Sequence, residues 1–523
     1  MKKSIQLSLS PEQAYEPGRL EAEIRKKARL KDGEIRIMRR SIDARRAPVR
    51  VQVAAEVYSG ENPPEKISFT KEFRNISDAP EVLIVGAGPA GLFAAIRLIE
   101  LGVKPVVIER GKDVRARRRD LAAINKEHIV NPESNYCFGE GGAGTYSDGK
   151  LYTRSKKRGD IRRILEVLVA HGARDEILFE AHPHIGTNKL PGIVTALRET
   201  ILEAGGEVMF NTRVDGFIRD STGITGVRLA DGTERKGKAV ILATGHSARD
   251  IFHMLSRDGI TIHRKPFALG VRIEHPQELI DSIQYHCKGP RDTYLPASSY
   301  SLSYQALYQE KRKGVFSFCM CPGGFIVPAA TSPGEVVVNG MSPSRRDSRF
   351  ANSGIVVAVD DDDFKDFMDR GELAAMYYQA SVEQEACRQA GGRQSAPAQR
   401  MTDFIQGKVS SRLNETSYQP GLVSADLHEI LPDPVAQRLK AGLKHFGKLM
   451  KGYLTSEAQL LGVESRTSSP VQIPRDRETY EHIDTPGLYP CGEGAGYAGG
   501  IVSAAMDGER CAEAVVRKYV HKK

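Results

Sequence analysis

The sequence is poor in cysteine and lacks the marks of a membrane or secreted protein. Only seven of its 523 residues are cysteines, too few and too scattered for a disulfide framework, so we expect mostly buried, reduced thiols. The uncharged run 82–96 holds three glycines and a proline and is too short to cross a bilayer. The N-terminal residues MKKSIQLSLSPEQ have a basic start but no apolar core of the kind that a secretory signal needs. These absences predict a cytoplasmic protein without a transmembrane segment.

The composition excludes further classes of protein. There are 75 Lys and Arg residues against 66 Asp and Glu residues, which gives a mildly basic formal net charge of +9. Hydrophobic residues make up 40% and charged residues 27% of the chain, as in soluble globular proteins, so disordered, collagenous and coiled-coil structures are set aside. The length allows about three domains.

Residues 1–78 are predicted to form a small α+β module. Apolar residues alternate with polar ones at 35–38 and 49–53, as in half-buried strands. Before them, residues 19–30 carry the apolar spacing of an amphipathic helix. The predicted order is strand, helix, strand, strand, and a linker follows over 59–80.

This module contains a cluster of arginines, at positions 36, 39, 40, 45, 46 and 50. Such a cluster forms either a solvated basic face or a nucleic-acid surface. RNA-binding modules of this size stack bases on aromatic side chains, and this segment offers only Tyr15 and Tyr58 before residue 60. We therefore expect a solvated face, and we expect no nucleic-acid partner.

A glycine motif follows the linker and lies between a predicted strand and a predicted helix. The apolar run 81–85 enters GAGPAG at 86–91, an Ala/Leu/Ile-rich helix follows to residue 101, and 106–108 is the next strand. This order is typical of a dinucleotide-binding βαβ unit. Gly86 would permit the tight turn, Gly88 would let the backbone approach a pyrophosphate, and Gly91 would let helix and strand pack closely. Glu109 closes the second strand, where its carboxylate would accept hydrogen bonds from a ribose and disfavour a 2′-phosphate.

The C-terminal region narrows the cofactor to FAD. In residues 487–501 a short strand delivers Glu493, glycines open a turn, and a helix begins near Ile501. This arrangement looks like the C-terminal motif of two-part FAD domains, whose helix N-terminus would stabilise the anion of the reduced flavin. The strand end 243–245 resembles the middle motif of the same domains. Three motifs in the expected order predict FAD, and no metal.

Over nearly its whole length the sequence resembles the bacterial and plastid FAD-dependent dehydrogenases within the glutathione-reductase-like flavoproteins. The segments that carry the resemblance include GAGPAGLFAA, GEGGAGTYSDGKL, PHIGTNKL, ATGHSARD, FALGVRIEHPQ, FSFCMCPGG, VVNGMSPSRRDS and GEGAGYAGGIVSAA. It implies an α/β fold with a discontinuous Rossmann-like FAD-binding domain (79–250 and 461–523), an inserted α+β substrate domain (251–460) and the N-terminal βαββ module (1–78). It also implies an FAD-dependent oxidoreductase that transfers hydride to or from the flavin, with an unassigned small-molecule substrate.

The motifs and the resemblance together assign a set of residues to the cofactor site. They are Gly86, Gly88, Pro89, Ala90, Gly91, Glu109, Arg110, Gly142, Thr145, Val214, Ala243, Thr244, Gly245, Gly492, Glu493, Gly499, Gly500 and Ile501. Glu493 stands where many relatives have Asp. The glycine-dense loop 139–147 is expected to wrap the flavin. The arginines at 110, 115 and 117–119 are expected to form a solvated face, with Arg110 covering the adenine as the alternative.

The strand predicted at 267–275 supplies candidate catalytic residues. Its alternation places Val271 and Ile273 on one face and Arg272 and Glu274 on the other. If the polar face meets the flavin, Arg272 would bind an anionic substrate and Glu274 or His275 would take a proton. The alternative is an Arg–Glu pair on a solvated sheet face.

Cys319-Met320-Cys321 raises the question of a redox or metal site. C-x-C lacks a second pair at zinc spacing, and a disulfide between alternate residues of a regular strand would be strained, so packing thiols are the expectation. His182 and His184 are likewise not taken as a metal site, because Thr187 is placed to cap a helix that begins near Asn188.

Three alternatives to a small-molecule oxidoreductase stay open at this point: a tRNA-modifying flavoprotein that docks RNA on the basic module, a membrane-associated flavin reductase that acts on lipids, and a flavin-binding protein without turnover. Residues 246–480 contain no second glycine fingerprint after a strand, so we expect only weak reduction by NAD(P)H.

Overall fold

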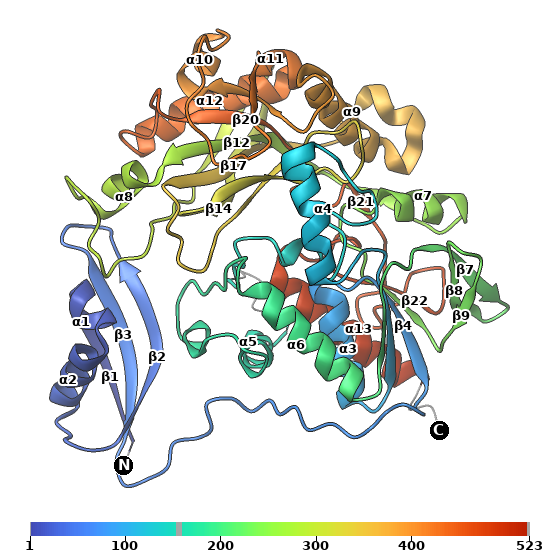
Figure 1. Cartoon of the computed structure of the whole chain (residues 1–523), viewed down its shortest axis with the longest axis horizontal. Coiled ribbons are helices and arrows are strands. Elements are labelled where there is room, and N and C mark those ends of the chain that lie inside the picture. The colour runs from blue at the N-terminus through green and yellow to red at the C-terminus, as the bar shows by residue number, and fades with distance from the viewer. Residues whose placement is uncertain (1, 153–158, 520–523) are drawn as a thin grey trace.

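The computed structural model describes residues 2–152 and 159–519 and confirms the predicted α/β fold class with its parallel sheet (Figure 1). The chain forms an N-terminal module, a parallel-sheet domain and a second domain built on a large sheet. Figure 1 shows the module at the left, the parallel sheet with its helices at the lower right and the second sheet above both.

The N-terminal module has the predicted order of elements. It contains β1 (Lys2–Leu9), α1 (Pro11–Tyr15), α2 (Pro17–Ala28), β2 (Glu34–Asp43) and β3 (Arg50–Tyr58), with an antiparallel sheet order of β1-β3-β2. Leu20, Ile24 and Ala28 of α2 are buried against Val51 and Val53 of β3, as the apolar spacing predicts. Residues 59–80 form no helix or strand and run below the parallel-sheet domain, in keeping with the predicted linker (Figure 1).

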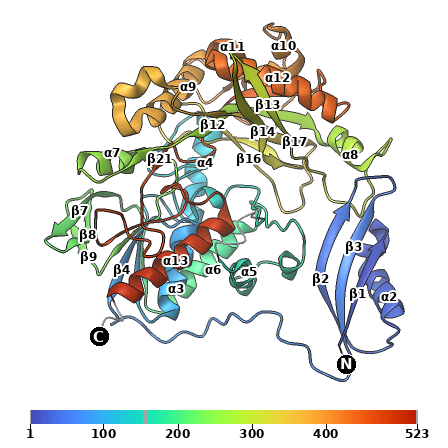
Figure 2. The same ribbon diagram turned by 180° about the vertical axis from the view of Figure 1, so that it is seen from behind.

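The parallel-sheet domain is built on five strands in the order β22-β10-β4-β5-β6. The strands are β4 (Glu81–Val85), β5 (Lys104–Ile108), β6 (Glu207–Met209), β10 (Val240–Leu242) and β22 (Leu488–Pro490). One face is covered by α3 (Pro89–Glu100), α5 (Ile161–Ala170), α6 (Leu190–Glu203) and α13 (Ile501–Tyr519), and Figure 2 shows α3 and α13 side by side. The other face packs on α7 (Arg249–Arg257) and on an antiparallel meander, β7 (Val214–Asp220), β8 (Gly223–Leu229) and β9 (Glu234–Lys236).

The second domain is built on seven strands in the order β13-β14-β17-β12-β20-β18-β19. They are β12 (Phe267–Pro276), β13 (Ser303–Tyr308), β14 (Lys311–Cys321), β17 (Phe350–Val359), β18 (Ala396–Arg400), β19 (Leu422–Ser424) and β20 (Gln459–Glu464). Its outer face packs on α9 (Ala374–Gln389) and α12 (Asp433–Leu449), with α8 (Gln277–Tyr285), α10 (Met401–Gln406) and α11 (Leu427–Ile430) nearby. The hairpin of β15 (Phe325–Pro328) and β16 (Val338–Met341) contacts its inner strands.

Sheet membership differs from the domain boundaries expected at 250/251 and 460/461. Helix α7 packs into the core of the parallel-sheet domain, whereas β20 pairs with β12 in the seven-stranded sheet. Between the domains, β11 (His263–Arg264) pairs with β21 (Val471–Gln472). We therefore propose that the inserted domain runs from about residue 266 to about 465, because helix packing and strand pairing outweigh the local texture of the sequence there.

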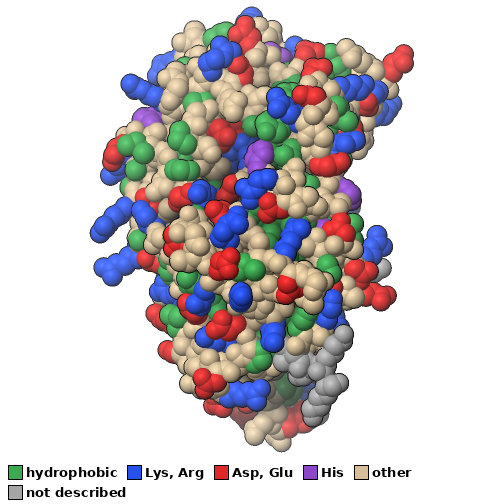
Figure 3. All heavy atoms as spheres, turned by 90° about the vertical axis from the view of Figure 1, so that its right-hand side faces the viewer, with side chains coloured by type: hydrophobic (Ala, Val, Ile, Leu, Met, Phe, Trp, Pro, Cys, Tyr) green, Lys and Arg blue, Asp and Glu red, His purple; other side chains and the backbone are tan. Residues whose placement is uncertain are grey.

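Two further observations bear on the expected environment of the protein. Within the described ranges, no helix is both long enough and apolar enough to cross a bilayer. Figure 3 shows acidic and basic side chains interspersed over the face that it presents, in keeping with the small net charge.

Candidate functional site

A cavity of about 410 Å³ lies between the parallel-sheet domain and the inserted domain, within the usual size range of ligand pockets. The carboxyl ends of β4, β5 and β10 open into it, and so does the start of α13. Phe318, Cys319 and Asn339 line it from the inserted domain. Three motif segments far apart in the sequence thus share one cavity, at the sheet edge where open α/β sheets bind ligands.

Most of the residues assigned to the cofactor site from the sequence line this cavity. Those that do are Gly86, Gly88, Pro89, Ala90, Glu109, Arg110, Gly142, Val214, Ala243, Thr244, Gly245, Glu493, Gly499, Gly500 and Ile501. Gly91, Thr145 and Gly492 lie behind the lining. Gly91 lets α3 pack on the glycine turn, while Thr145 and Gly492 make hydrogen bonds within their loops or to α13.

The three glycines of the fingerprint have different surroundings. Gly86 has φ +107°, and a Cβ built there would lie 2.4 Å from the carbonyl oxygen of Ala243. A Cβ on Gly91 would lie 1.9 Å from the carbonyl oxygen of Gly86, so this glycine lets α3 pack on the turn. At Gly88, which caps α3, a Cβ would meet no atom within 4 Å. The space beside Gly88 and the free N–H groups of the helix N-terminus fit a bound pyrophosphate.

Glu109 joins three backbone segments around the predicted adenosine end. Its buried carboxylate accepts hydrogen bonds from the backbone N–H of Ala87 at 2.9 Å, Gly111 at 2.9 Å and Gly139 at 3.0 Å. Beside it, Arg110 pairs with Glu133 and Asp250, and its guanidinium lies 4.4 Å from the ring centre of Phe138. Both residues line the cavity, which fits a place at the ribose for Glu109 and the alternative place at the adenine for Arg110.

Arg117 corrects the expectation of a solvated basic face after Glu109. It is fully buried, and its guanidinium donates to the carbonyl oxygens of Asn135 at 2.7 Å, Glu140 at 2.9 Å and Gly142 at 3.0 Å. Burial lowers its pKa from the usual value of an arginine. It is placed by α4 (Val114–Glu127), on the apolar side of the helix. Arg117 therefore holds the glycine loop from behind, while Arg115, Arg118 and Arg119 are exposed as expected.

The glycine loop itself approaches the fingerprint turn closely. Gly139, Gly141 and Gly142 all have positive φ, and a Cβ on Gly142 would lie 3.3 Å from the Cα of Gly88. The Thr145 hydroxyl donates to the carbonyl oxygen of Glu140 at 3.1 Å, so it stabilises the loop from the buried side. The loop and the turn together form a narrow backbone cradle, as expected for a segment that wraps a cofactor.

At the other end of the cavity, the turn before α13 is held by carboxylates. Glu493 accepts a hydrogen bond from the backbone N–H of Gly500, and its carboxylate lies 3.5 Å from Nε2 of His246. Burial lowers the pKa of His246, which favours the neutral imidazole. Behind the lining, the N–H of Gly492 donates to Asp507 at 2.8 Å. Glu493 thus faces the cavity while it fixes the turn.

The three catalytic candidates on β12 do not line the cavity. Arg272, Glu274 and His275 are 0%, 2% and 1% exposed, which also rules out the solvated-face alternative. Arg272 donates to Asn352, to Glu464 and to the carbonyl oxygen of Cys319, each at 2.7 Å. A Cβ on Gly340 of β16 would lie 2.0 Å from this guanidinium, so the hairpin covers the face that was expected to meet the flavin.

The other two candidates are occupied in a similar way. Glu274 accepts a hydrogen bond from the backbone N–H of Ser417 at 3.1 Å. His275 is within 2.9 Å of the carbonyl oxygen of Tyr453, and burial lowers its pKa to about 4. The capping role of Thr187 was also wrong, because α6 begins at Leu190 after Lys189 and has no side-chain cap. His184 contacts the carbonyl oxygen of Ser344 at 3.1 Å.

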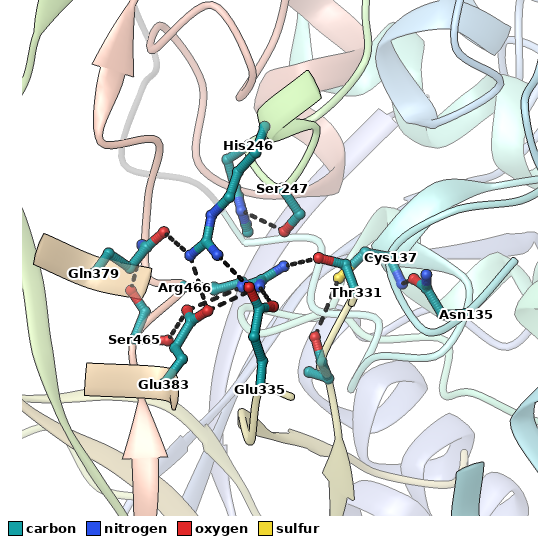
Figure 4. A network of polar contacts seen from close by, with 12 residues as sticks. Asn135, Cys137, His246, Ser247, Thr331, Glu335, Gln379, Glu383, Ser465 and Arg466 are labelled. Atoms are coloured by element: carbon teal, nitrogen blue, oxygen red, sulfur yellow. Dashed lines mark hydrogen bonds and ion pairs between the residues drawn. The ribbon is translucent and has the colours of Figure 1, made fainter. Parts of the chain in front are cut away.

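A network of four charged residues, three of them buried and Arg249 partly exposed, joins the two domains beside the cavity (Figure 4). It was not anticipated from the sequence. Arg249 contacts Glu335 at 2.7 Å and Glu383 at 2.8 Å, and Arg466 contacts the same two carboxylates at 2.8 and 2.9 Å. Burial alone would raise the pKa of Glu383, but the two arginines hold it at about 2. Arg466 also lines the cavity. Two positive and two negative charges balance, as buried ions require.

Comparisons with known proteins agree with this site. Residues 266–467 match the family described as FAD-dependent protein, C-terminal domain-like, residues 79–241 match an FAD binding domain, residues 186–299 match the family FAD dependent oxidoreductase, and residues 1–58 match a domain of unknown function. An uncharacterized protein of Clostridium beijerinckii is 41% identical over 520 residues, which cover 96% of each chain. The chain therefore belongs to the same family as this protein. It is an FAD-dependent oxidoreductase, and its substrate is unassigned.

More distant similarities cover less of the chain or are weaker. Thiamine thiazole synthase of Aeropyrum pernix is 28% identical over 183 residues, 32% of this chain and 55% of that protein. The flavin-dependent brominase Bmp2 is 14% identical with a TM-score of 0.38, over 85% of this chain and 80% of its own. L-proline dehydrogenase from P. horikoshii is 13% identical with a TM-score of 0.33, over 85% and 95% of the two chains.

Proposed function

We propose that FAD lies along the cavity, with its adenosine at Glu109, its pyrophosphate between Gly88 and Gly142, and its ring system before the start of α13. The observation that carries this proposal is the meeting of the three motif segments in one cavity, with open space beside Gly88. Bound FAD would supply a two-electron carrier that accepts or donates hydride.

The chain's own residues would bind and orient the cofactor. The N–H groups at the start of α3 face the pyrophosphate position, and the positive end of α13 faces the ring, where it favours the negative charge of the reduced state. The substrate would enter at the end lined by Lys150, Phe318 and Asn339, because Phe318 and Asn339 come from the inserted domain, which carries none of the three cofactor motifs. The proposed reaction is hydride transfer to or from a small molecule placed there.

We also propose membership of the glutathione-reductase-like group and a cytoplasmic location. The first is supported by the order of the glycine fingerprint, the strand end 243–245 and the C-terminal motif along the chain. The second is supported by the thiols, since all seven cysteines are free. We propose no nucleic-acid partner, because arginines of the module are used internally: Arg36 pairs with Glu34, Arg45 with Asp43, and Arg40 with Glu180 of the neighbouring domain.

Two glycine variants test the proposed cofactor position. In Gly88→Val the side chain would project into the space beside the helix N-terminus, so the purified protein should lose most of its FAD while its apoprotein keeps its melting temperature. The matched control is Gly192→Val, another glycine in the first turn of a helix, exposed and with no atom within 4 Å of its Cβ position. The control should keep FAD. Equal FAD content in Gly88→Val and the wild type would contradict the proposed position.

The reaction is tested by an anaerobic screen. The holoprotein is mixed with candidate metabolites and the loss of the oxidised flavin spectrum is followed. A metabolite that reduces the flavin in the wild type identifies the substrate class. If no metabolite and no nicotinamide reduces the flavin, and if an added oxidant does not reoxidise the photoreduced enzyme, a flavin-binding protein without turnover would be favoured.

A further inference from the structure

The segment Cys319-Met320-Cys321 does not form a regular strand. The register between β14 and β17 shifts between Phe318 and Cys321, and Cys319 has a φ of +45°. Such a bulge re-aims side chains, and strained non-glycine residues of this kind cluster at functional sites. The bulge turns Cys319 to the cavity, while Cys321 stays buried beneath it. The expectation that two strand cysteines would make a strained disulfide therefore does not apply here.

Two cations lie against the cysteine pair. Lys150 lines the cavity and donates to the carbonyl oxygen of Met320, the residue between the two cysteines. Arg272 places Nη2 at 3.4 Å from Sγ of Cys321 and at 2.7 Å from the carbonyl oxygen of Cys319. Asp148 lies within ion-pair distance of both Arg346 and Lys150, and Glu464 pairs with Arg272, so three cations stand against two carboxylates here. A positive environment with partial access to solvent is where reactive cysteines are found.

This environment separates the protonation states of the two thiols. The hydrogen bond with Cys321, helped by the charges of Lys150 and Arg272, outweighs burial and holds the pKa of the Cys319 thiol well below its usual value. The same hydrogen bond, together with burial, raises the pKa of Cys321. The pair is therefore one thiolate, at the cavity, and one thiol behind it.

We propose that Cys319 and Cys321 form a redox-active dithiol that exchanges an electron pair with the flavin, an inference that rests on FAD occupying the cavity as proposed above. In the oxidising direction, a bond forms between the two sulfur atoms, the S–H bond of Cys321 breaks, and the pair gives up two electrons and one proton. FAD held in the cavity would supply the acceptor for both electrons and for that proton, so charge and atoms balance. The reverse step reduces the disulfide.

Cys137 and Cys491 also line the cavity, but neither combines partial exposure with a second thiol behind it. Cys137 lines the cavity, and its Sγ lies 3.8 Å from the carbonyl oxygen of Ala329. Cys491 is fully buried and belongs to a cluster with Cys511 and Asp507 whose ligand atoms lie within 4.8 Å of one another. Arg475 already supplies the positive charge there, at 2.6 Å from Asp507 and 3.5 Å from Sγ of Cys511. We therefore assign the redox role to the bulge alone.

The test is an anaerobic reductive titration of the oxidised holoprotein. The wild type should take up about four electrons per flavin, because a disulfide and a flavin each accept a pair. Cys319→Ser and Cys321→Ser should each take up about two electrons while they keep FAD. The matched control is Cys287→Ser, which removes a cysteine far from the cavity lining and should behave as the wild type does. FAD content and melting temperature show that each variant is folded.

A second measurement follows the sulfur atoms. In oxidised wild-type protein, the peptide that contains both cysteines should be lighter by two hydrogens and resist alkylation, and after reduction Cys319 should alkylate faster than Cys137. Lys150→Met should slow that alkylation near neutral pH. Uptake of about two electrons by the wild type, or of about four by Cys319→Ser, would overturn the proposal. A wild-type chain without bound flavin overturns the proposed cofactor position and the exchange together, whereas bound flavin with no disulfide overturns the dithiol alone.

Discussion

Replacing Arg117 tests how the glycine loop is held beside the cofactor. In Arg117→Met the side chain keeps much of its length but loses the guanidinium. The carbonyl oxygens of Asn135 and Gly142 then lose this donor, and that of Glu140 keeps the Thr145 hydroxyl. Because Arg117 is 0% exposed, water does not reach these groups without a local rearrangement. We expect the loop to move away from α4 and the cradle opposite Gly88 to open.

The size of the effect follows from the contacts. A buried acceptor without a partner costs about 1–3 kcal/mol, which for the carbonyl groups of Asn135 and Gly142 would total about 2–6 kcal/mol, whereas Glu140 keeps the Thr145 hydroxyl as a donor. Some of this is recovered, because the arginine itself is buried without a contacting carboxylate and its removal relieves that cost. We take about 3 kcal/mol as the net effect. If FAD binds only after the displaced loop returns to its place, this free energy is taken from the binding of FAD, and the dissociation constant of FAD rises about 100-fold.

The assay is a titration of apoprotein with FAD, followed by the change in flavin fluorescence. The matched control is Arg115→Met, on the exposed side of the same helix, which should bind FAD as the wild type does. Arg117→Lys should recover only part of the affinity, because an ammonium group does not reproduce the fork that reaches three carbonyl oxygens. An Arg117→Met variant with wild-type affinity and an unchanged melting temperature would refute the reasoning.

Three further predictions concern other parts of the molecule. Reduction of the flavin by NADPH or NADH should be slow and should not saturate in the micromolar range, since 246–480 has no second fingerprint; rapid, saturable reduction in stopped-flow traces would reveal a missed site. Arg40→Ala should speed proteolysis within 59–80 but leave FAD bound, because Arg40 contacts Glu180 at 2.6 Å across the module boundary; an unchanged digestion rate would show that this contact does not hold the module. Burial raises the pKa of Glu509 from 4.5 to about 7. The unfolded chain therefore loses this proton at a lower pH than the folded protein does, and the free energy of unfolding falls as pH rises from 4.5 to about 7. Glu509→Gln should lessen the difference in melting temperature between pH 5 and pH 8, and an identical difference would contradict the shift.

Local patterns predicted the parts of the fold in which neighbours in sequence are neighbours in space. The helix expected at 19–30 is α2 (Pro17–Ala28), and the βαβ unit from residue 81 to 108 has the predicted order. Gly86, Gly88 and Gly91 have the geometry that the fingerprint implies, since backbone conformation alone decides it. Such features need no knowledge of distant partners.

The burial of Arg117 could have been predicted from the spacing of apolar residues in the sequence. The buried residues of α4 are Val114, Arg117, Leu121 and Ile124, at spacings of three, four and three. This is the period of one helix face, so the arginine lies in the middle of an apolar stripe. Helical spacing, applied to the charged residue as well as to its apolar neighbours, would have placed Arg117 inside.

Arg272 shows what local patterns cannot supply. Alternation along β12 correctly separates Arg272 from Val271 and Ile273, but which face meets water depends on other strands. Its partner Glu464 is 192 residues away, and Gly340 covers it from a hairpin between the two. Long-range strand pairing thus converts an expected site residue into a buried support, while Cys319, next to it, becomes part of the lining.

The charged network beside the cavity explains how a site shared by two domains keeps a fixed geometry. Arg249 begins α7 on the parallel-sheet side, Glu383 lies on α9 of the inserted domain, and Arg466 contacts the latter while it lines the cavity. Loss of one member would leave an uncompensated buried charge, at a cost of about 3–5 kcal/mol, so separation of the domains at this joint is unfavourable. Because hydride transfer depends on short distances, a joint that resists opening would also hold the inserted domain in place beside the proposed flavin position. The side chains that join the domains therefore also set the distance across the proposed reaction site.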